Sequence, residues 1–340
     1  MILIDDYNLV PSSNEFEIVN RIGQRQITHA IHDIDGTHSL IRNWPPVMSI
    51  CLYNVIQNGL PEDFDSKEKI DSLVARTGSQ TLPETDSFCI ESAGLSALTQ
   101  MEWAIRCGIQ AGTVRIPDYH LTDEDLTKNA EIIEEIWQGK EVFEHYNESP
   151  IIKKFLSQYT PRLFRLYEIV LRYACRDANL KSALANPAKW QVPGSVEFLE
   201  MLYRGGIKNY FVTGAVVSLN EKKQPEGMLE EVLALGYSIG KGNLIEEIYG
   251  SSWNKKITKY EAITQLIGEL DLKGDNILIV GDGRTEIQIA KIIGAVAISR
   301  LPLAANRQRQ IHRNLDTNYI VADYANADFS KFFTKHAKKA

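Results

Sequence analysis

Residues 28–37 read THAIHDIDGT, and the fold is inferred outward from this stretch. Residues 28–34 are predicted to form a strand, because they continue a pattern of short apolar runs that recurs further along the chain. In a strand, residues two positions apart point to the same face, so Asp33 and Asp35 can converge on one ligand. Gly36 allows a turn with a close backbone approach, and the hydroxyl of Thr37 can bind an anion.

The second half of the chain alternates strands with helices. Four apolar runs are predicted strands: residues 209–213, 276–280, 295–298 and 319–321. The segments between them carry apolar residues at helical spacing, and glycines close the helices. This alternation is typical of α/β proteins, so we expect a doubly wound parallel sheet that includes the strand at 28–34.

The segment between that first strand and the others has a different character. Residues 122–146 and 161–175 have the pattern of long amphipathic helices, and strand candidates are scarce. We therefore predict a mainly α-helical cap, residues 42–188, inserted into a core made of residues 1–41 and 189–340. The first 25 residues receive no assignment.

Composition excludes several classes of protein. The net charge of −7 provides no basic surface for nucleic acid or anionic membranes. No apolar run approaches membrane-spanning length, and the acidic start lacks the features of a signal peptide. The four cysteines form no CxxC pair, so neither a zinc site nor a disulfide framework is expected. We expect a cytoplasmic protein that binds neither nucleic acid nor membranes, and its oligomeric state is not indicated.

Polar residues follow three of the predicted strands. Besides Asp33 and Asp35, Thr213 and Gly214 stand at the end of one strand, and Asp282 and Glu286 follow another. Ligands of open α/β sheets bind at the carboxyl ends of the strands. Carboxylates and hydroxyls gathered there would form an oxygen-rich site suited to Mg²⁺ rather than to a softer metal.

In their order and spacing these segments resemble the four motifs of the haloacid-dehalogenase (HAD) superfamily. DIDGT at 33–37 resembles the first motif, FVTGA at 211–215 the second, and GDGRTE at 281–286 the fourth. A lysine near a helix start resembles the third motif. The resemblance covers the core, about half of the chain, whereas the helical insert matches the family's cap only by position.

The resemblance implies an Mg²⁺-dependent phosphatase that hydrolyses a small phosphorylated metabolite. Asp33 resembles the nucleophile that forms an aspartyl-phosphate, and Asp35 the acid/base that protonates the leaving oxygen and then activates water. Asp33, the backbone carbonyl of Asp35 and Asp282 would hold Mg²⁺. Thr213 would bind a phosphoryl oxygen, and a lysine would pair with the nucleophile and the phosphate.

Two assignments in these motifs stay open. Three lysines compete for the third motif, Lys255, Lys256 and Lys259, and we favour Lys259 because Thr258 and Glu261 form a capping-box pattern that starts a helix there. Glu286 stands where the family usually has an aspartate, and the sequence does not decide whether it contacts the metal directly or through water.

Residues that would contact the substrate are also proposed. Thr37 and Gly214 are candidates for phosphate binding. In the cap, Arg162, Arg165 and Arg172 lie at helical spacing and could meet an anionic substrate, and of these Arg172 is taken as the candidate. Closure of the cap over Asp33 would exclude water from the reaction.

Other activities are less consistent with the motifs. Asp35 argues against a dehalogenase, which does not need that acid/base, and the absence of DKTG argues against a cation-pump ATPase. A phosphomutase or another phosphotransferase remains an alternative, as does a non-catalytic protein that binds a phosphorylated metabolite. The substrate itself is not indicated, because the cap contains no motif that identifies one.

Overall fold

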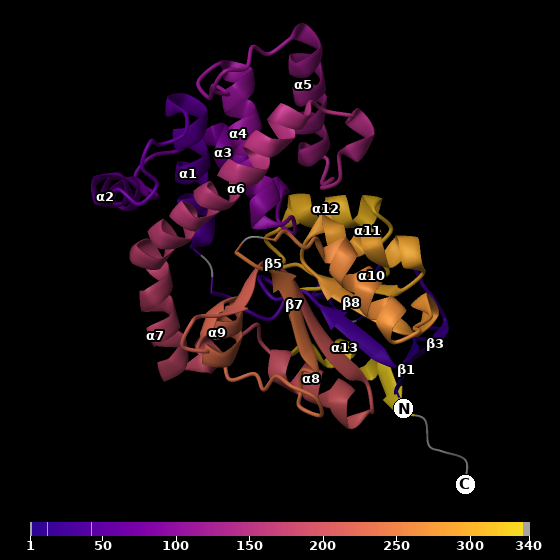
Figure 1. Ribbon diagram of the computed structural model, residues 1–340. Helices are drawn as coiled ribbons and strands as arrows, with labels where there is room; N and C mark the ends of the chain where they lie inside the picture. The colour runs from indigo at the N-terminus through magenta and orange to yellow at the C-terminus, as the bar shows by residue number, and fades with distance from the viewer. Residues whose placement is uncertain (1, 12, 42, 254, 336–340) are drawn as a thin grey trace. The chain divides into compact units, whose positions relative to one another are not determined.

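The computed structural model describes residues 2–11, 13–41, 43–253 and 255–335, and the chain forms two compact units (Figure 1). Unit 1 comprises residues 1–42, 180–252 and 257–340, and unit 2 comprises residues 43–179 and 253–256. Residues 180–188, which were expected in the cap, belong to unit 1. Residue 42 and residues 336–340, which fall within the expected domains, lie outside the described residues.

A parallel sheet forms the centre of unit 1. Within the described residues eight strands join it, in the order β2-β10-β9-β8-β4-β5-β6, with β7 paired to β5. The six parallel strands are β4 (His29–His32), β5 (Lys208–Leu219), β7 (Glu247–Ser251), β8 (Ile277–Gly281), β9 (Val296–Arg300) and β10 (Tyr319–Val321). The α/β fold with a parallel sheet is confirmed.

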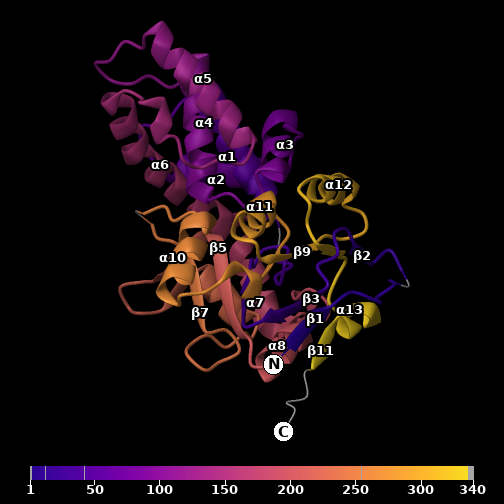
Figure 2. The same ribbon diagram turned by 90° about the vertical axis from the view of Figure 1, so that its right-hand side faces the viewer.

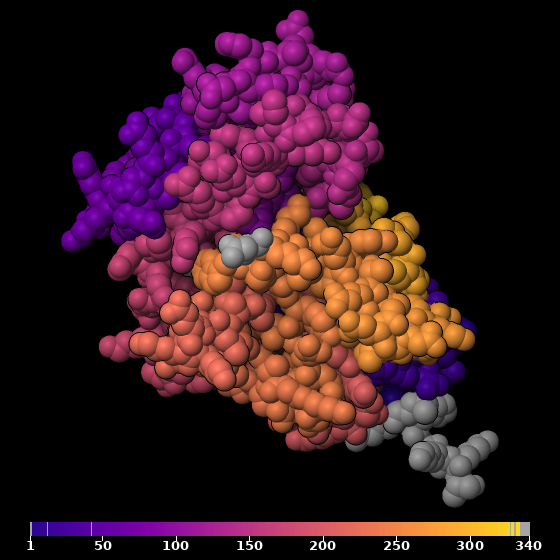
Figure 3. Space-filling view, viewed as in Figure 1, coloured from indigo at the N-terminus to yellow at the C-terminus, as the bar shows by residue number. Residues whose placement is uncertain are grey.

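Helices cover both faces of this sheet. Successive strand residues point to opposite faces, so adjacent apolar residues of one strand pack against different helices. Ile31 packs with α10 (Lys259–Glu269) and α11 (Arg284–Ile293). Its neighbour Ala30 lies in the core that includes α8 (Ser195–Arg204) and α13 (Ala327–Lys331). In the space-filling view, side chains of the orange segment that contains α10 close over one face of the unit (Figure 3).

The remaining helices of unit 1 lie around the edges of the sheet. They are α9 (Met228–Ala234), α12 (Asn306–Asn314) and the second half of α7 (Asp177–Ala185). Leu180 and Ala183 of α7 pack with Val232 of α9 and with Phe211 of β5 in a third cluster of buried side chains.

Short strands at the start of the chain pair with strands near its end, so residues that received no assignment have regular structure. A separate antiparallel sheet has the order β11-β1-β3, formed by β1 (Ile2–Asp5), β3 (Gln24–Ile27) and β11 (Phe333–Lys335) (Figure 2). The strand β2 (Phe16–Ile18) pairs with β10 at the edge of the main sheet.

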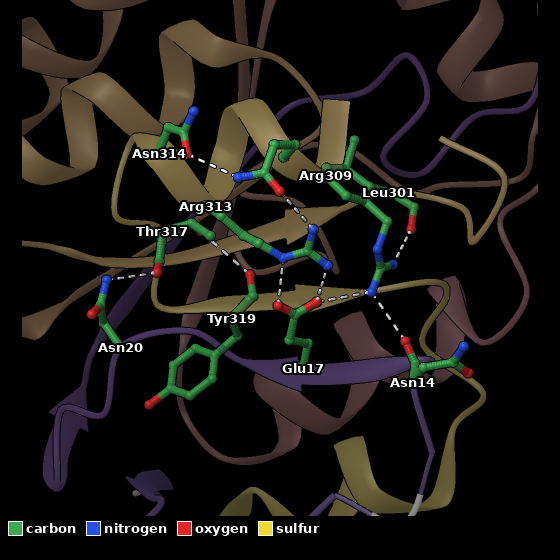
Figure 4. Close-up of polar contacts among 10 residues, drawn as sticks. Asn14, Glu17, Asn20, Leu301, Arg309, Arg313, Asn314, Thr317 and Tyr319 are labelled. Carbon is green, nitrogen blue, oxygen red and sulfur yellow. Dashed lines mark hydrogen bonds and ion pairs between the residues drawn. The ribbon is translucent and has the colours of Figure 1, made fainter. Parts of the chain in front are cut away.

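Glu17 fixes β2 to helix α12 (Figure 4). Its carboxylate accepts hydrogen bonds from Arg313 Nε at 2.7 Å and Nη2 at 2.8 Å, and from Arg309 Nη2 at 3.2 Å. Arg309 also donates to the carbonyl oxygens of Leu301 and Asn14, each at 3.0 Å. The hydrogen bonds from Arg313 are the main reason that the pKa of Glu17 is lowered. Ionic contacts therefore add to the backbone pairing with β10 and the burial of Phe16 that hold this three-residue strand.

Unit 2 is helical, as expected for the insert. Its helices are α1 (Trp44–Asn58), α2 (Lys67–Arg76), α3 (Pro83–Glu91), α4 (Ala97–Ala111), α5 (Asp123–Trp137), α6 (Pro150–Leu171) and the start of α7. Phe88 and Trp103 stack at its centre with ring centroids 3.7 Å apart. Buried Arg106 joins α4 to Glu148 by two hydrogen bonds, at 2.6 and 3.0 Å.

The short segment 253–256 belongs to unit 2, although the residues on either side of it belong to unit 1. Trp253 packs against Phe164, with ring centroids 5.8 Å apart. The ammonium group of Lys256 donates to the carbonyl oxygen of Glu141 at 3.0 Å and to Thr99 Oγ1 at 3.1 Å. The chain therefore passes between the two units four times.

None of the helices in the described part of the chain combines the length and the apolar character needed to cross a membrane. The four cysteines lie in unit 2 and are free thiols. Burial raises the pKa of Cys51 to about 12.

Candidate functional site

Three adjacent strands bring the motif residues together. Strand β4 lies between β8 and β5, and all three run in parallel. Asp33 follows β4 directly, and its backbone N–H continues the ladder by donating to the carbonyl oxygen of Val280 on β8 at 2.9 Å. Asp282 comes directly after Gly281, the last residue of β8. The first and fourth motifs therefore meet at the carboxyl edge of the sheet.

Residues 33–39 form a tight acidic turn. Three successive N–H groups, those of Thr37, His38 and Ser39, donate to the carbonyl oxygen of Ile34, and the Gly36 N–H donates to the carbonyl of Ser39 at 2.9 Å. Gly36 has a φ of 71°, a conformation in which a side chain would be strained. The Thr37 hydroxyl is buried and lies 3.5 Å from Asp33 Oδ2.

The second motif differs from the expectation in one respect. Thr213 was expected at the end of its strand, but β5 continues to Leu219, so that expectation is wrong. Residues 217–219 pair with β6 (Pro225–Gly227) in a hairpin, which extends the strand beyond the sheet. The pairing of β5 with β7 shifts register between Val212 and Val216, and in this irregularity the buried Thr213 Oγ1 accepts from Ala215 N at 3.1 Å.

Of the three competing lysines, the structure brings Lys259 to Asp33. The capping box of Thr258 and Glu261 is present, and Lys259 is the first residue of α10. Its Nζ donates to Asp33 Oδ1 at 2.7 Å and also to Glu286 Oε1. Burial opposes the charged form, but the charges of Asp33 and Glu286 outweigh it and raise the pKa of Lys259. Lys256 instead contacts unit 2, and Lys255 is exposed.

Glu286 lies in the first turn of α11 with its side chain folded over the end of β8. Gly281 makes room for it, since a Cβ atom at position 281 would lie 2.6 Å from Glu286 Cγ. The side chain is buried, and Oε2 has no hydrogen-bond partner within the described residues. Burial raises the pKa of Glu286 although Lys259 acts to lower it. An unsatisfied buried carboxylate oxygen indicates room for a further ligand.

Asp35 lies among negative charges. Burial raises its pKa well above the usual value, and the charges of Glu231, Asp33 and Asp282 add to the effect. A carboxyl group in this environment retains its proton more readily than an exposed one, as a general acid requires.

Two residues near the turn were not identified from the sequence. Glu231 of α9 accepts a hydrogen bond from Ser39 Oγ at 2.7 Å, and Arg300, at the end of β9, donates to the Gly36 carbonyl at 2.9 Å. Both are buried. The available signal for Arg300 was an arginine two residues after the predicted strand 295–298, whereas nothing in the spacing of MLEEVLA distinguished Glu231 from a surface acid.

The expected donors, Asp33, Asp282 and the backbone carbonyl of Asp35, are all oxygens, the type of ligand that Mg²⁺ prefers. Groups of three or more His, Cys, Asp or Glu side chains that could hold a metal ion are absent from the described residues. The expected ligand set requires only two direct carboxylates, from Asp33 and Asp282, because the third protein ligand is the backbone carbonyl of Asp35.

The cap candidates lie in unit 2. Arg172 is exposed, within a π-helical turn (Arg172–Arg176), and its Nε lies 3.3 Å from Asp177 Oδ1. The Arg162 guanidinium stacks over the rings of Phe64 and Tyr159, 4.5 and 5.3 Å from their centroids. Arg172 is thus shown in contact with Asp177, and its contact with a substrate stays a prediction.

No family model and no curated protein matches the chain. Among solved structures it is similar to a predicted phosphoglycolate phosphatase from Haemophilus somnus, with 15% identity over 88% of this chain and 96% of that one and a TM-score of 0.41. It is also similar to a predicted phosphatase from Clostridium acetobutylicum, with 13% identity, 87% and 94% coverage and a TM-score of 0.46.

A β-phosphoglucomutase from Clostridium difficile shows 12% identity over 90% of this chain and 95% of its own, with a TM-score of 0.46. The chain is also similar to a structure described as a haloacid dehalogenase-like hydrolase from Bacteroides fragilis, with 12% identity over 88% of this chain and 99% of that one and a TM-score of 0.44. Because these identities and TM-scores are low, the similar structures assign no role to any residue of this chain.

Proposed function

We propose that this chain is an Mg²⁺-dependent phosphatase that hydrolyses a small phosphate monoester through an aspartyl-phosphate on Asp33. The observation that carries the proposal is the buried contact between Lys259 and Asp33, 2.7 Å long, at the end of the central strand. Lys259 pairs with one oxygen of Asp33, Oδ1, and the other oxygen, Oδ2, lies 3.5 Å from the Thr37 hydroxyl. A carboxylate with an adjacent cation is suited to attack phosphorus.

The reaction would proceed in two steps. A carboxylate oxygen of Asp33 forms a bond to phosphorus, and the bond to the leaving oxygen breaks as that oxygen takes the proton of Asp35. Asp35, now ionised, takes a proton from water, whose oxygen attacks the phosphorus and releases phosphate and the Asp33 carboxylate. The raised pKa of Asp35 supports the first of these roles.

Other side chains would bind and orient the transferred group. Lys259 would stabilise negative charge on its oxygens, and Thr213 and Thr37 would donate hydrogen bonds. Bound Mg²⁺, held by Asp33, Asp282 and the Asp35 carbonyl, would neutralise charge on the phosphoryl oxygens. Glu286 Oε2 would accept a hydrogen bond from a water molecule of the metal. The Gly214 backbone and Arg172 remain candidates for contacts with the phosphate and the rest of the substrate.

The proposal is tested with purified protein and 4-nitrophenyl phosphate. We expect release of equal amounts of 4-nitrophenol and inorganic phosphate with Mg²⁺, and no reaction in EDTA. Asp33→Asn should abolish turnover because an amide is not a nucleophile here, while the exposed Asp275→Asn serves as the matched control and keeps full activity. Undiminished hydrolysis by Asp33→Asn, or in EDTA, would contradict the mechanism. A panel of phosphorylated metabolites then identifies the substrate.

A further inference from the structure

Five buried polar side chains form a continuous chain behind the acidic turn. Tyr237 OH lies 2.7 Å from Ser195 Oγ, which lies 2.7 Å from His38 Nδ1. His38 Nε2 lies 3.0 Å from His32 Nδ1, and His32 Nε2 lies 3.3 Å from Asn209 Oδ1. All five are at most 2% exposed, and they come from five different segments of unit 1.

The donor and the acceptor of each hydrogen bond in this series of five side chains can be derived by starting from Asn209. The Asn209 amide nitrogen donates to the carbonyl oxygens of Leu199 and Leu244, at 3.2 and 3.1 Å, so its Oδ1 must be an acceptor. His32 therefore carries its proton on Nε2, and its Nδ1 accepts.

The same reasoning fixes the other imidazole. His38 must donate from Nε2 to His32, which leaves its Nδ1 to accept from the Ser195 hydroxyl. Ser195 then accepts from Tyr237 at 2.7 Å, and the Tyr237 hydroxyl also lies 3.3 Å from the His38 carbonyl oxygen. Both rings are neutral in this arrangement. That agrees with their burial, which lowers the pKa of His32 to about 3 and that of His38 well below its usual value.

The bond between the two imidazoles joins the ends of the acidic turn. His32 immediately precedes Asp33, and His38 follows Asp35 by three residues, so the turn that carries Asp33, Asp35 and Thr37 lies between the two rings. The backbone of the turn is held as well, because the Thr37 carbonyl accepts from Tyr324 OH at 3.0 Å. The distance between the two carboxylates therefore depends on a closed loop of covalent and hydrogen bonds.

We propose that His38 is a positioning residue, whose ring holds Asp35 in register with Asp33 by linking Ser195 to His32 in a single tautomeric state. This inference rests on the proposed function, in which both aspartates act on one phosphoryl group. His38 is fully buried, and the proposed mechanism gives it no contact with the substrate or the metal. It acts through the geometry of the turn, where a displacement of about 1 Å can cost about 100-fold in rate.

The test compares three variants by steady-state kinetics on an aryl phosphate with Mg²⁺. His38→Leu keeps the bulk but removes both hydrogen bonds, and should lower kcat by about 10- to 100-fold with KM changed by less than about threefold. His38→Gln supplies one acceptor and one donor on neighbouring atoms, and should recover most of the lost kcat.

His312→Leu is the matched control. His312 is also a buried histidine bonded to a serine, with Nδ1 2.7 Å from Ser299 Oγ, but it joins α12 to β9 and is not part of the turn. This variant should lose stability and keep the kcat of the folded enzyme. If His38→Leu behaves like His312→Leu, the positioning role is wrong while the phosphatase assignment stands.

A second measurement does not depend on activity. The ¹⁵N shifts of the imidazole nitrogens should show both His32 and His38 as neutral rings protonated on Nε2. A proton on Nδ1 of either ring would overturn the proposal whatever the kinetics. A wild-type protein that shows the expected tautomers but hydrolyses no phosphate ester would instead refute the proposed function, and the positioning role with it.

Discussion

At the scale of single residues, Gly281 determines where Glu286 lies. Its missing side chain leaves the space that the Glu286 Cβ, Cγ and Cδ atoms occupy, between 2.6 and 3.0 Å from the position of a Cβ atom. Because Glu286 in turn contacts Lys259, and Lys259 contacts Asp33, Gly281 acts on the proposed nucleophile through two side chains. Its effect is one of volume and does not depend on backbone conformation.

We expect Gly281→Ala to displace Glu286 and to lower kcat/KM by about 10-fold or more, since Lys259 then loses one of its two partners. Gly268→Ala in α10 is the matched control, because a Cβ there meets no atom within 4 Å. That change should stabilise the protein by up to about 1 kcal/mol and leave the kinetics unchanged. Equal activity of the two variants in the aryl phosphate assay would show that Glu286 adapts without consequence.

The three lysines give a second prediction at this scale. Lys259→Ala should reduce turnover by about 100-fold or more, because it removes the cation that faces Asp33 and the transferred phosphate. Lys255→Ala and Lys256→Ala should retain turnover within about threefold, since Lys255 is exposed and Lys256 donates to Thr99 and Glu141. Parallel kcat measurements on the three variants decide the matter, and equal mild effects would remove Lys259 from its role.

How far the site could be predicted from sequence depends on whether its residues are neighbours in the chain. Asp33, Asp35 and Asp282 follow recognisable strands, and the capping box at Thr258 distinguished Lys259 from its neighbours. Glu231 and Arg300 reach the acidic turn from separate elements, 192 and 264 residues from their partners. No local pattern marks such contacts. The same applies to the chain of Tyr237, Ser195 and the two histidines.

At the scale of secondary-structure elements, the strands of the parallel sheet were predictable because apolar runs and amphipathic helices alternate locally. The N-terminal strands β1 to β3 were not. Each has three or four residues, and the partners β11 of β1 and β10 of β2 lie about 300 residues away in sequence, while β3 pairs with β1. The wrong end assigned to the strand at Thr213 has a similar cause, since the extension to Leu219 is stabilised by a hairpin that the strand pattern alone does not reveal.

Strand β2 provides a prediction about pH. The pKa of Glu17 is lowered in the folded protein, so its ionic contacts contribute stability that is present above the unfolded pKa, near 4.5, and is lost as pH falls through the folded value. Glu17→Gln should therefore lower the free energy of unfolding by about 1–2 kcal/mol at pH 7. Urea unfolding of both proteins should show this difference shrinking in acid. A difference that does not depend on pH would exclude the ionic explanation.

At the scale of the whole molecule, buried neutral histidines make the fold sensitive to acid. Burial lowers the pKa of His32 to about 3 and that of His312 to about 4, whereas both are near 6.5 when the chain is unfolded. Between these values the unfolded chain binds more protons than the folded one, so stability falls as pH falls below about 6.5. Each histidine should cost on the order of 2 kcal/mol between pH 7 and 5.

This effect can be measured by urea unfolding at a series of pH values. His312→Leu should be less stable than the wild type at pH 7, but its free energy of unfolding should decline less steeply down to pH 5. If the free energy of unfolding declined equally with pH in both proteins, the pKa of His312 would not be lowered in the folded state.

Segment 253–256 bears on how such proteins could be recombined. Because it packs in unit 2 while its neighbours in sequence belong to unit 1, the helical unit is not one contiguous piece of chain. A chimaera that exchanged only residues 43–179 would retain Trp253 and Lys256 without the groups that they contact, the side chains of Phe164 and Thr99 and the backbone carbonyl of Glu141. An exchange of the helical unit must therefore include residues 253–256 as well as residues 43–179. We expect these two segments to change together when one cap replaces another.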